Sequence, residues 1–209
     1  MGRVSTDDPT SADDPTSADD VADAFSDPAD ADISTDRDAA VGEAPARAGR
    51  RLFWFTLVVA APVVLLDQGT KLWAVTTLAD GQTIPVIGDL IRFVLVYNPG
   101  AAFSIGTEYT WVLAVLAAAA VVGIAWFAWS VRSIGWMVAL GLVLGGAATH
   151  LGDRLFREPG FGRGHVVDFI GYGNLFVGNV ADIAIFSGAV LILLLTLRGV
   201  GTGRTDSAS

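Results

Sequence analysis

Two aspartates in the last third of the chain, Asp168 and Asp182, are the residues best suited to chemistry. Neither has an obvious neighbouring cation, and two carboxylates held close together cannot both ionise, so such a pair shares one proton. One member can then activate water while the other protonates a carbonyl oxygen, which is peptide hydrolysis of the aspartic kind. A structural interpretation of Asp182 stays open, because Asn179 could cap a helix whose third residue is Asp182.

Four other charged residues have structural interpretations that require no chemistry. Asp67 and Lys71 are spaced i,i+4, so they can neutralise each other on one helix. Asp153 and Arg154 are adjacent, and each can pair with groups elsewhere in the chain. Their functional interpretation rests on where the helices place them.

Four long apolar stretches must position these side chains. A bilayer core about 30 Å thick needs roughly 20 apolar residues in a helix. We expect transmembrane helices over approximately residues 52–79, 110–131, 134–155 and 180–197. A soluble helical bundle does not fit, because residues 111–131 carry no charge and the stretches lack amphipathic periodicity. The predicted fold class is therefore mainly α, a polytopic membrane protein with four transmembrane helices.

Helix geometry brings the charges into one layer. With a rise of about 1.5 Å per residue, Asp67 and Lys71 lie roughly 22–28 Å along the first helix. Asp153 and Arg154 lie about 28–30 Å along the third helix, and Asp182 falls in the first turn of the fourth. Charged residues at membrane depth are costly and are functional candidates by default.

The connecting segments 80–109 and 152–179 contain β-branched runs punctuated by glycine and proline, which predict short strands. We expect a small extracytoplasmic β-rich cap on one membrane face. Basic residues near the helix ends indicate the orientation. One side carries Arg47, Arg50, Arg51, Arg132, Arg198 and Arg204, and the other carries Arg92, Arg154, Arg157 and Arg163. This bias places both termini in the cytoplasm and the charged layer near the outer face of the cell membrane.

The formal charge of −9 on the 209 residues resides entirely in residues 1–50, where a unit Asp-Asp-Pro-Thr-Ser-Ala is repeated at 7–12 and 13–18. Such a polar segment cannot bury enough surface to offset the entropy of ordering, so we predict a disordered acidic arm over 1–50. A membrane domain over 51–199 and a tail over 200–209 follow. The absence of cysteine excludes a disulfide scaffold and a cysteine nucleophile, and no basic stripe exists to bind nucleic acid.

The apolar domain resembles the lipoprotein signal peptidases (signal peptidase II), which are four-helix membrane aspartic endopeptidases of bacteria. Five motifs in order carry the resemblance over nearly all of residues 52–197. They are Asp67-Gln68-Gly69-Thr70-Lys71, Asn98-Pro99-Gly100-Ala101-Ala102-Phe103, Gly145-Gly146-Ala147 with Asp153-Arg154, Val166-Val167-Asp168-Phe169, and Asn179-Val180-Ala181-Asp182. Each motif alone is weak, but the ordered set is specific.

The resemblance implies that Asp168 and Asp182 form the catalytic dyad. It also implies a set of residues that shape the site, which are Asp67, Lys71, Asn98, Gly100, Asp153, Arg154 and Asn179. The implied substrate is a prolipoprotein whose lipobox cysteine already carries diacylglycerol, cut just before that cysteine. We expect the chain to act as a monomer among membrane lipids in the bacterial cell membrane.

Two positions depart from the family pattern. The family usually has Gly-Asn where this chain has Thr149-His150, and a phenylalanine where it has Gly178. A neutral imidazole offers one donor and one acceptor, as an amide does, so we predict that His150 contacts the substrate.

The sequence also allows three alternative interpretations. A proton-coupled membrane transporter that uses intramembrane carboxylates would want acids near the midplane and an internal repeat, which the chain lacks. A scaffold with structural ion pairs leaves the extended segment 166–169 unexplained. A metal site would need His150 or His165 to have a second imidazole at ligand spacing, and neither has one, so we expect no metal and no cofactor.

Overall fold

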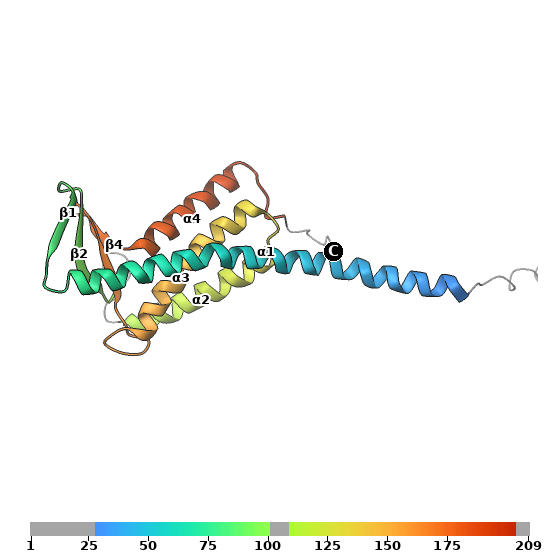
Figure 1. Ribbon diagram of the computed structural model, residues 1–209, viewed down its shortest axis with the longest axis horizontal. Helices are drawn as coiled ribbons and strands as arrows, with labels where there is room; N and C mark the ends of the chain where they lie inside the picture. The colour runs from blue at the N-terminus through green and yellow to red at the C-terminus, as the bar shows by residue number, and fades with distance from the viewer. Residues whose placement is uncertain (1–27, 101–108, 204–209) are drawn as a thin grey trace, which may run out of the picture. The chain divides into compact units, whose positions relative to one another are not determined.

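The computed structural model describes residues 28–100 and 109–203, with side chains from Phe53 onward. Their elements follow in the order α1, β1, β2, α2, α3, β3, β4 and α4 (Figure 1). The chain divides into two compact units, Met1–Ala44 and Pro45–Ser209, and the second unit carries the apolar spans, the sheet and the candidate site.

Helix α1 runs from Pro28 to Thr77. The backbone of residues 28–50 is therefore helical, although we predicted disorder for 1–50, and residues 1–27 of that arm lie outside the described residues. A helix extends more easily than it nucleates, and the alanine-rich sequence before the first span favours such an extension.

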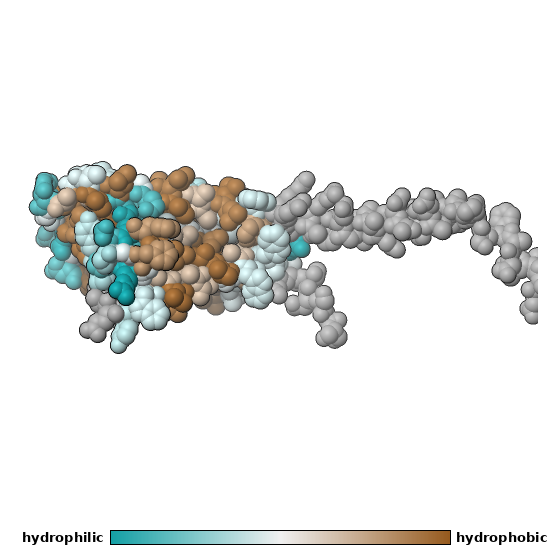
Figure 2. All heavy atoms as spheres, turned by 90° about the horizontal axis from the view of Figure 1, so that it is seen from below, coloured by the Kyte–Doolittle hydropathy of each residue, from teal (hydrophilic) through white to brown (hydrophobic). Residues whose placement is uncertain are grey.

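Four helices among the described residues are long and apolar enough to cross a membrane. They are Phe53–Thr77 within α1, α2 (Thr110–Ser130), α3 (Ile134–Phe156) and α4 (Val180–Leu197). Large apolar side chains such as Trp126, Leu65 and Phe186 are exposed on them. Figure 2 shows apolar side chains over the helical part of one face and hydrophilic ones gathered toward the sheet. Contiguous apolar surface of this kind suits lipid, and the predicted fold class is confirmed.

Helix α3 is the most buried of the four spans. Glycines allow its neighbours to approach its backbone closely. A Cβ at Gly145 would lie 2.8 Å from the carbonyl oxygen of Ala60 on α1, and one at Gly146 would lie 2.8 Å from that of Ala181 on α4. Small residues at helix interfaces permit this close packing in membranes. The polar end of α3 is consequently held between α1 and α4.

A four-stranded antiparallel sheet lies at the end of the spans where α1 and α3 finish and α2 and α4 begin (Figure 1). Its strands in spatial order are β1 (Thr83–Ile87), β2 (Ile91–Asn98), β3 (Val166–Tyr172) and β4 (Phe176–Gly178). The β2–β3 register pairs Val96 with Asp168 and Asn98 with Val166. The two predicted segments thus contribute two strands each to one sheet.

An apolar cluster fixes the sheet to α1. Phe169 of β3 packs with Ala74 and Leu78 of α1, and the rings of Trp73 and Phe93 meet edge to face with centroids 5.2 Å apart. Successive strand residues point to opposite faces, so anchoring Phe169 on α1 turns its neighbour Asp168 toward the other face.

The segment after α4 returns to the link between α2 and α3. The backbone N–H of Arg132 donates to the carbonyl of Thr202 at 2.8 Å, and the indole N–H of Trp136 donates to that of Val200 at 2.8 Å. The remaining tail residues, 204–209, lie outside the described part of the chain.

Candidate active site

A fully buried lysine connects two helices near the sheet. Lys71 Nζ lies 2.7 Å from Asp67 Oδ2 on the same helix and 2.7 Å from Asp153 Oδ2 on α3. All three side chains are at most 1% exposed. The i,i+4 pair that the sequence predicts is present, and it is extended by a second carboxylate.

The other carboxylate oxygens of this cluster bind further elements. Arg157 Nε donates to Asp153 Oδ1 at 2.6 Å, and Gln68 Nε2 donates to the same oxygen at 3.0 Å. Asp67 Oδ1 accepts the backbone N–H of Ala181, in the first turn of α4, at 2.9 Å. The Lys71 cluster, comprising Asp67, Gln68, Lys71, Asp153 and Arg157, therefore ties α1, α3 and the start of α4 together.

Asp168 is held by two amide side chains. Its Oδ2 accepts from Asn98 Nδ2 at 2.9 Å, and its Oδ1 accepts from Asn179 Nδ2 at 2.6 Å. Asn98 is itself oriented by the backbone N–H of Gly100, which donates to Asn98 Oδ1 at 3.0 Å. The carboxyl group of Asp168 is thus fixed by neutral donors from β2 and from the start of α4.

The start of α4 has the capping geometry that the sequence left open for Asp182. The N-cap Asn179 accepts the backbone N–H of Asp182 at 3.1 Å, and Asp182 Oδ2 accepts the backbone N–H of Asn179 at 2.9 Å. Capping does not occupy the second oxygen of the carboxylate. Because Asn179 contacts both carboxylates, it also fixes their relative position.

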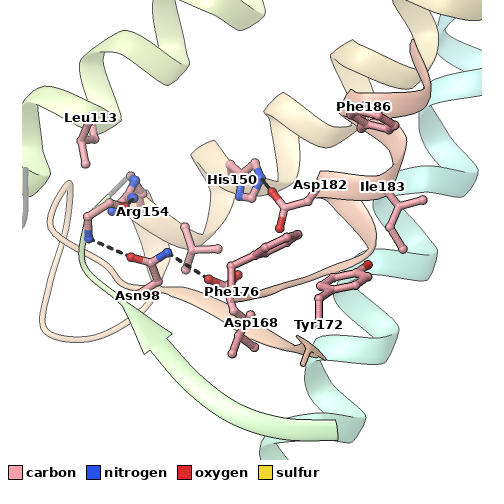
Figure 3. A pocket seen from close by; sticks show the side chains of 13 residues that line it. Asn98, Leu113, His150, Arg154, Asp168, Tyr172, Phe176, Asp182, Ile183 and Phe186 are labelled. Carbon is pink, nitrogen blue, oxygen red and sulfur yellow. Dashed lines mark hydrogen bonds and ion pairs between the residues drawn. The ribbon is translucent and has the colours of Figure 1, made fainter. Parts of the chain in front are cut away.

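Two side chains one turn apart on α3 face the same region (Figure 3). His150 Nε2 lies 3.1 Å from Asp182 Oδ1. The guanidinium of Arg154 donates to the carbonyls of Pro99 and Gly100, holding the segment after β2 against α3. Asp153, between them in sequence, points instead into the Lys71 cluster.

A cavity of about 720 Å³ opens between these elements. Its polar residues are Asn98, His150, Arg154, Asp168, Tyr172 and Asp182, and its apolar walls include Leu113, Val166, Phe176, Val177, Ile183 and Phe186. Figure 3 shows these side chains converging from the helices and strands. The cavity is large enough for an extended peptide segment with an apolar group, and the two aspartates are its acids.

Electrostatics distinguishes Asp168 within the cavity. Burial raises the pKa of Asp168 to about 6, the hydrogen bond from Asn98 opposes this rise, and the negative charge of Asp182 adds to it. Burial also raises the pKa of Tyr172 on β3, and the charge of Asp182 raises it further. Asp168 is therefore a carboxyl that retains a proton well above the usual range of aspartate.

The structure brings together every site residue predicted from sequence within its described part. Asp168, Asp182, Asn98, His150 and Arg154 line the cavity with Gly100, whereas Asp67, Lys71 and Asp153 stand behind it in the Lys71 cluster. The motif residues 101–103 lie outside the described residues. Sequence reasoning missed Gln68, Arg157 and Tyr172. The i,i+4 spacing of Asp153 and Arg157 was the available signal for one of them.

Both departures from the family pattern lie at Asp182. His150 contacts one carboxylate oxygen, and a Cβ added at Gly178 would lie 2.8 Å from the other, Oδ2. A larger residue at position 178 would collide with the carboxylate of Asp182, so the glycine makes room for this carboxylate and does not merely loosen the local packing.

Similarity to known proteins agrees with the geometry. The family model described as Signal peptidase (SPase) II matches residues 59–198. The chain is 49% identical over 157 residues to a lipoprotein signal peptidase of Mycolicibacterium smegmatis, covering 75% of this chain and 66% of that protein. It is 50% identical over 143 residues to the Mycobacterium avium protein of the same name, covering 68% and 79%. With the Mycobacterium tuberculosis protein the identity is 46% over 171 residues, covering 82% and 85%.

Two solved structures, each described as a bacterial membrane enzyme, share the fold. One has a TM-score of 0.61 at 23% identity, covering 74% of this chain and 94% of that chain. The other has a TM-score of 0.60 at 26% identity, covering 68% and 92%. The transporter alternative finds no support among these similarities. The family match includes the Lys71 cluster, both cavity aspartates and, apart from the first residues of the α1 span, all four spans. The chain therefore belongs to the signal peptidase II family of membrane proteases.

Proposed function

We propose that this chain is an aspartic endopeptidase whose catalytic pair is Asp168 and Asp182. The observation that carries the proposal is that these two carboxylates, from β3 and α4, face one cavity and are bound by amides and an imidazole instead of by lysine or arginine. A pair without a fixed cation can exchange a proton with a substrate, whereas an ion-paired carboxylate resists protonation.

The two members have different tasks. Asp168 is buried and its pKa is raised to about 6, so it is the member that holds the proton and donates it to the scissile carbonyl oxygen. Asp182 sits at the positive end of the α4 dipole and accepts a backbone N–H, so it is the ionised member. It removes a proton from a water molecule, which attacks the carbonyl carbon without a covalent enzyme intermediate. Asp182 then passes this proton to the leaving amine as the C–N bond breaks, and Asp168 recovers its own proton as the new carboxyl group forms.

The substrate is a prolipoprotein, as the names of the relatives indicate, with diacylglyceryl on the cysteine that follows the cleaved bond. Leu113 of α2 and Ile183 and Phe186 of α4 form an apolar wall of the cavity within the spans. Acyl chains placed against this wall would hold the scissile bond at the depth of the carboxylates. Binding energy from the lipid thereby positions the peptide for reaction.

The site faces the outer side of the membrane, with both termini in the cytoplasm. Of the four arginines counted on the sheet side, Arg154 donates to backbone carbonyls and Arg157 pairs with the buried Asp153, which leaves Arg92 and Arg163 without an acidic partner on that side among the described residues. The positive bias toward the other side is therefore stronger than the simple count suggests.

The test is cleavage of a diacylglyceryl lipobox peptide by purified protein in detergent, with the product identified by mass spectrometry. Wild type should cut before the lipidated cysteine and should leave the peptide with an unmodified cysteine essentially intact. Asp89→Asn is the matched control, because Asp89 is an exposed carboxylate in the turn after β1. Failure of the folded wild type to cut the lipidated peptide, or normal cleavage by Asp168→Asn or Asp182→Asn, would contradict the proposal.

A further inference from the structure

Every carboxylate oxygen of Asp182 has a defined environment. Oδ2 accepts the backbone N–H of Asn179 at 2.9 Å, and Oδ1 lies 3.1 Å from Nε2 of His150. The imidazole comes from α3 and the carboxylate from α4, so the contact spans two helices. The side chain of His150 is 22% exposed and that of Asp182 is 44% exposed, and both open to the cavity.

Gly178 completes the environment of this carboxylate. A Cβ at this position would lie 2.8 Å from Asp182 Oδ2, which is closer than carbon and oxygen can approach without movement. The carboxylate thus has free space on the side of Gly178 in β4 and a hydrogen-bond donor, His150, on the side of α3. These two constraints select the orientation in which Oδ1 points at the imidazole.

The other ionisable groups around His150 have partners of their own or line the same cavity. Arg154 of α3 donates to backbone carbonyls, and Asp168 of β3 is bound by amides. From α1, Lys71 is held between its two carboxylates. Tyr172 of β3 lines the same cavity, and α2 contributes Leu113. His150 is the ionisable side chain that contacts Asp182 among the described residues.

We propose that His150 is a positioning residue, which donates from Nε2 to Asp182 Oδ1 and thereby keeps Asp182 oriented and ionised for attack by water. This inference rests on the proposed function. It differs from the expectation that His150 contacts the substrate, since the imidazole acts through the carboxylate. With Nε2 protonated and bound, the dyad proton is left to Asp168.

The kinetic test compares His150→Ala and His150→Gln with wild type. Loss of a hydrogen bond to a charged group should lower kcat of His150→Ala roughly 10- to 100-fold, while KM stays within about twofold. Glutamine carries an amide N–H at a reach similar to Nε2, so His150→Gln should recover most of the lost kcat. His165→Gln, which replaces the other histidine, is the matched control.

The pH profile separates positioning from packing. An imidazole changes its charge between pH 5 and 8, and an amide does not. A hydrogen bond from a charged donor is stronger than one from a neutral donor, so wild type should remain active to lower pH than His150→Gln. Superimposed acidic limbs of kcat/KM for the two proteins would overturn the charge role.

A second measurement is independent of cleavage. The ¹⁵N shifts of labelled imidazole rings report which nitrogen carries the proton, and the His165→Gln background leaves His150 as the observed ring. In neutral imidazole we expect the Nε2–H tautomer in wild type and in Asp168→Asn, and a mixture of tautomers in Asp182→Asn.

These outcomes distinguish the inference from the proposed function. An Nε2–H tautomer that depends on Asp182, in a protein that cuts no lipopeptide, would support the contact and reject the peptidase proposal. An Nδ1–H tautomer, or one insensitive to Asp182→Asn, would overturn the inference even if cleavage is normal. A rise in KM of His150→Ala at unchanged kcat would likewise overturn it and favour direct contact with the substrate.

Discussion

Four aspartates lie close together at the sheet end of the spans, and they form two pairs with opposite surroundings. Asp67 and Asp153 share the buried Lys71, and Asp153 also binds Arg157. Asp168 and Asp182 receive hydrogen bonds from amides, a backbone N–H and an imidazole, and they line a cavity. The first pair is closed off by protein, and the second is accessible to a ligand.

The difference fits a structural role for the first pair and the proposed chemical role for the second. A carboxylate with a fixed buried cation stays ionised, because protonating it would leave the cation without a partner. A carboxylate bound by amides, or by an imidazole that can itself titrate, can gain or lose a proton, since none of these partners carries a permanent charge. Charged residues inside a membrane protein therefore cannot be assigned to catalysis by depth alone. The partner of each charged group indicates whether its role is structural or chemical. The two pairs of aspartates can therefore be tested against each other.

The largest expected effect is on the open pair. Asp168→Asn and Asp182→Asn should each lower kcat by roughly 10²- to 10⁴-fold, because each removes one half of the proton transfer. Because the two residues act as a unit, the double variant should be little worse than either single one. Steady-state kinetics on the lipidated peptide measures this. If the loss of kcat in the double variant equals the product of the two single losses, the two residues contribute independently and do not act as a pair.

The closed pair should respond through stability. Lys71→Met leaves Asp67 and Asp153 buried without their shared cation, and breaking a buried ion pair costs about 3–5 kcal/mol. Unfolding in detergent followed by tryptophan fluorescence measures the loss. The control Asp89→Asn should stay within about 0.5 kcal/mol of wild type. Normal stability with abolished cleavage in Lys71→Met would instead place the lysine in the chemistry.

The loss of activity toward alkaline pH should come from Asp168. Its pKa is raised to about 6 by burial, so the carboxyl is protonated below that pH and ionised above it. If Asp168 donates the proton, kcat/KM falls as pH rises through this range, by about tenfold per unit. A profile from pH 5 to 9 measures this. A limb that rises instead with pH through this range would assign the proton to the other aspartate.

The sequence predicted the spans, and which charged residues lie near one another, better than it predicted the contacts between those residues. Uncharged apolar stretches define the helices, and i,i+4 spacing alone indicates the Asp67–Lys71 pair. The contact of Asp153 with Lys71 was not predictable, because it depends on how closely α3 packs on α1. The contact of His150 with Asp182 depends likewise on the approach of α3 to α4. The helical backbone of residues 28–50 was not predicted, because the composition of this segment indicated only that ordering it is costly. It did not indicate that these residues are part of the same helix as the first span.

The smallest effect that we predict lies at Tyr172, whose ring stacks on Phe176 in the cavity with centroids 4.6 Å apart. The negative charge of Asp182 adds to burial in raising the pKa of Tyr172, so Asp182→Asn should lower the pH at which this tyrosine ionises. Ultraviolet titration in a Tyr97→Phe/Tyr109→Phe background observes Tyr172 alone. Asp168→Asn is the matched control, because four residues of strand place Asp168 about 13 Å from Tyr172 along β3. An equal downward shift in both variants would show that the tyrosine responds to the total charge of the cavity. An unchanged midpoint in Asp182→Asn would show that the charge of Asp182 does not reach the ring of Tyr172.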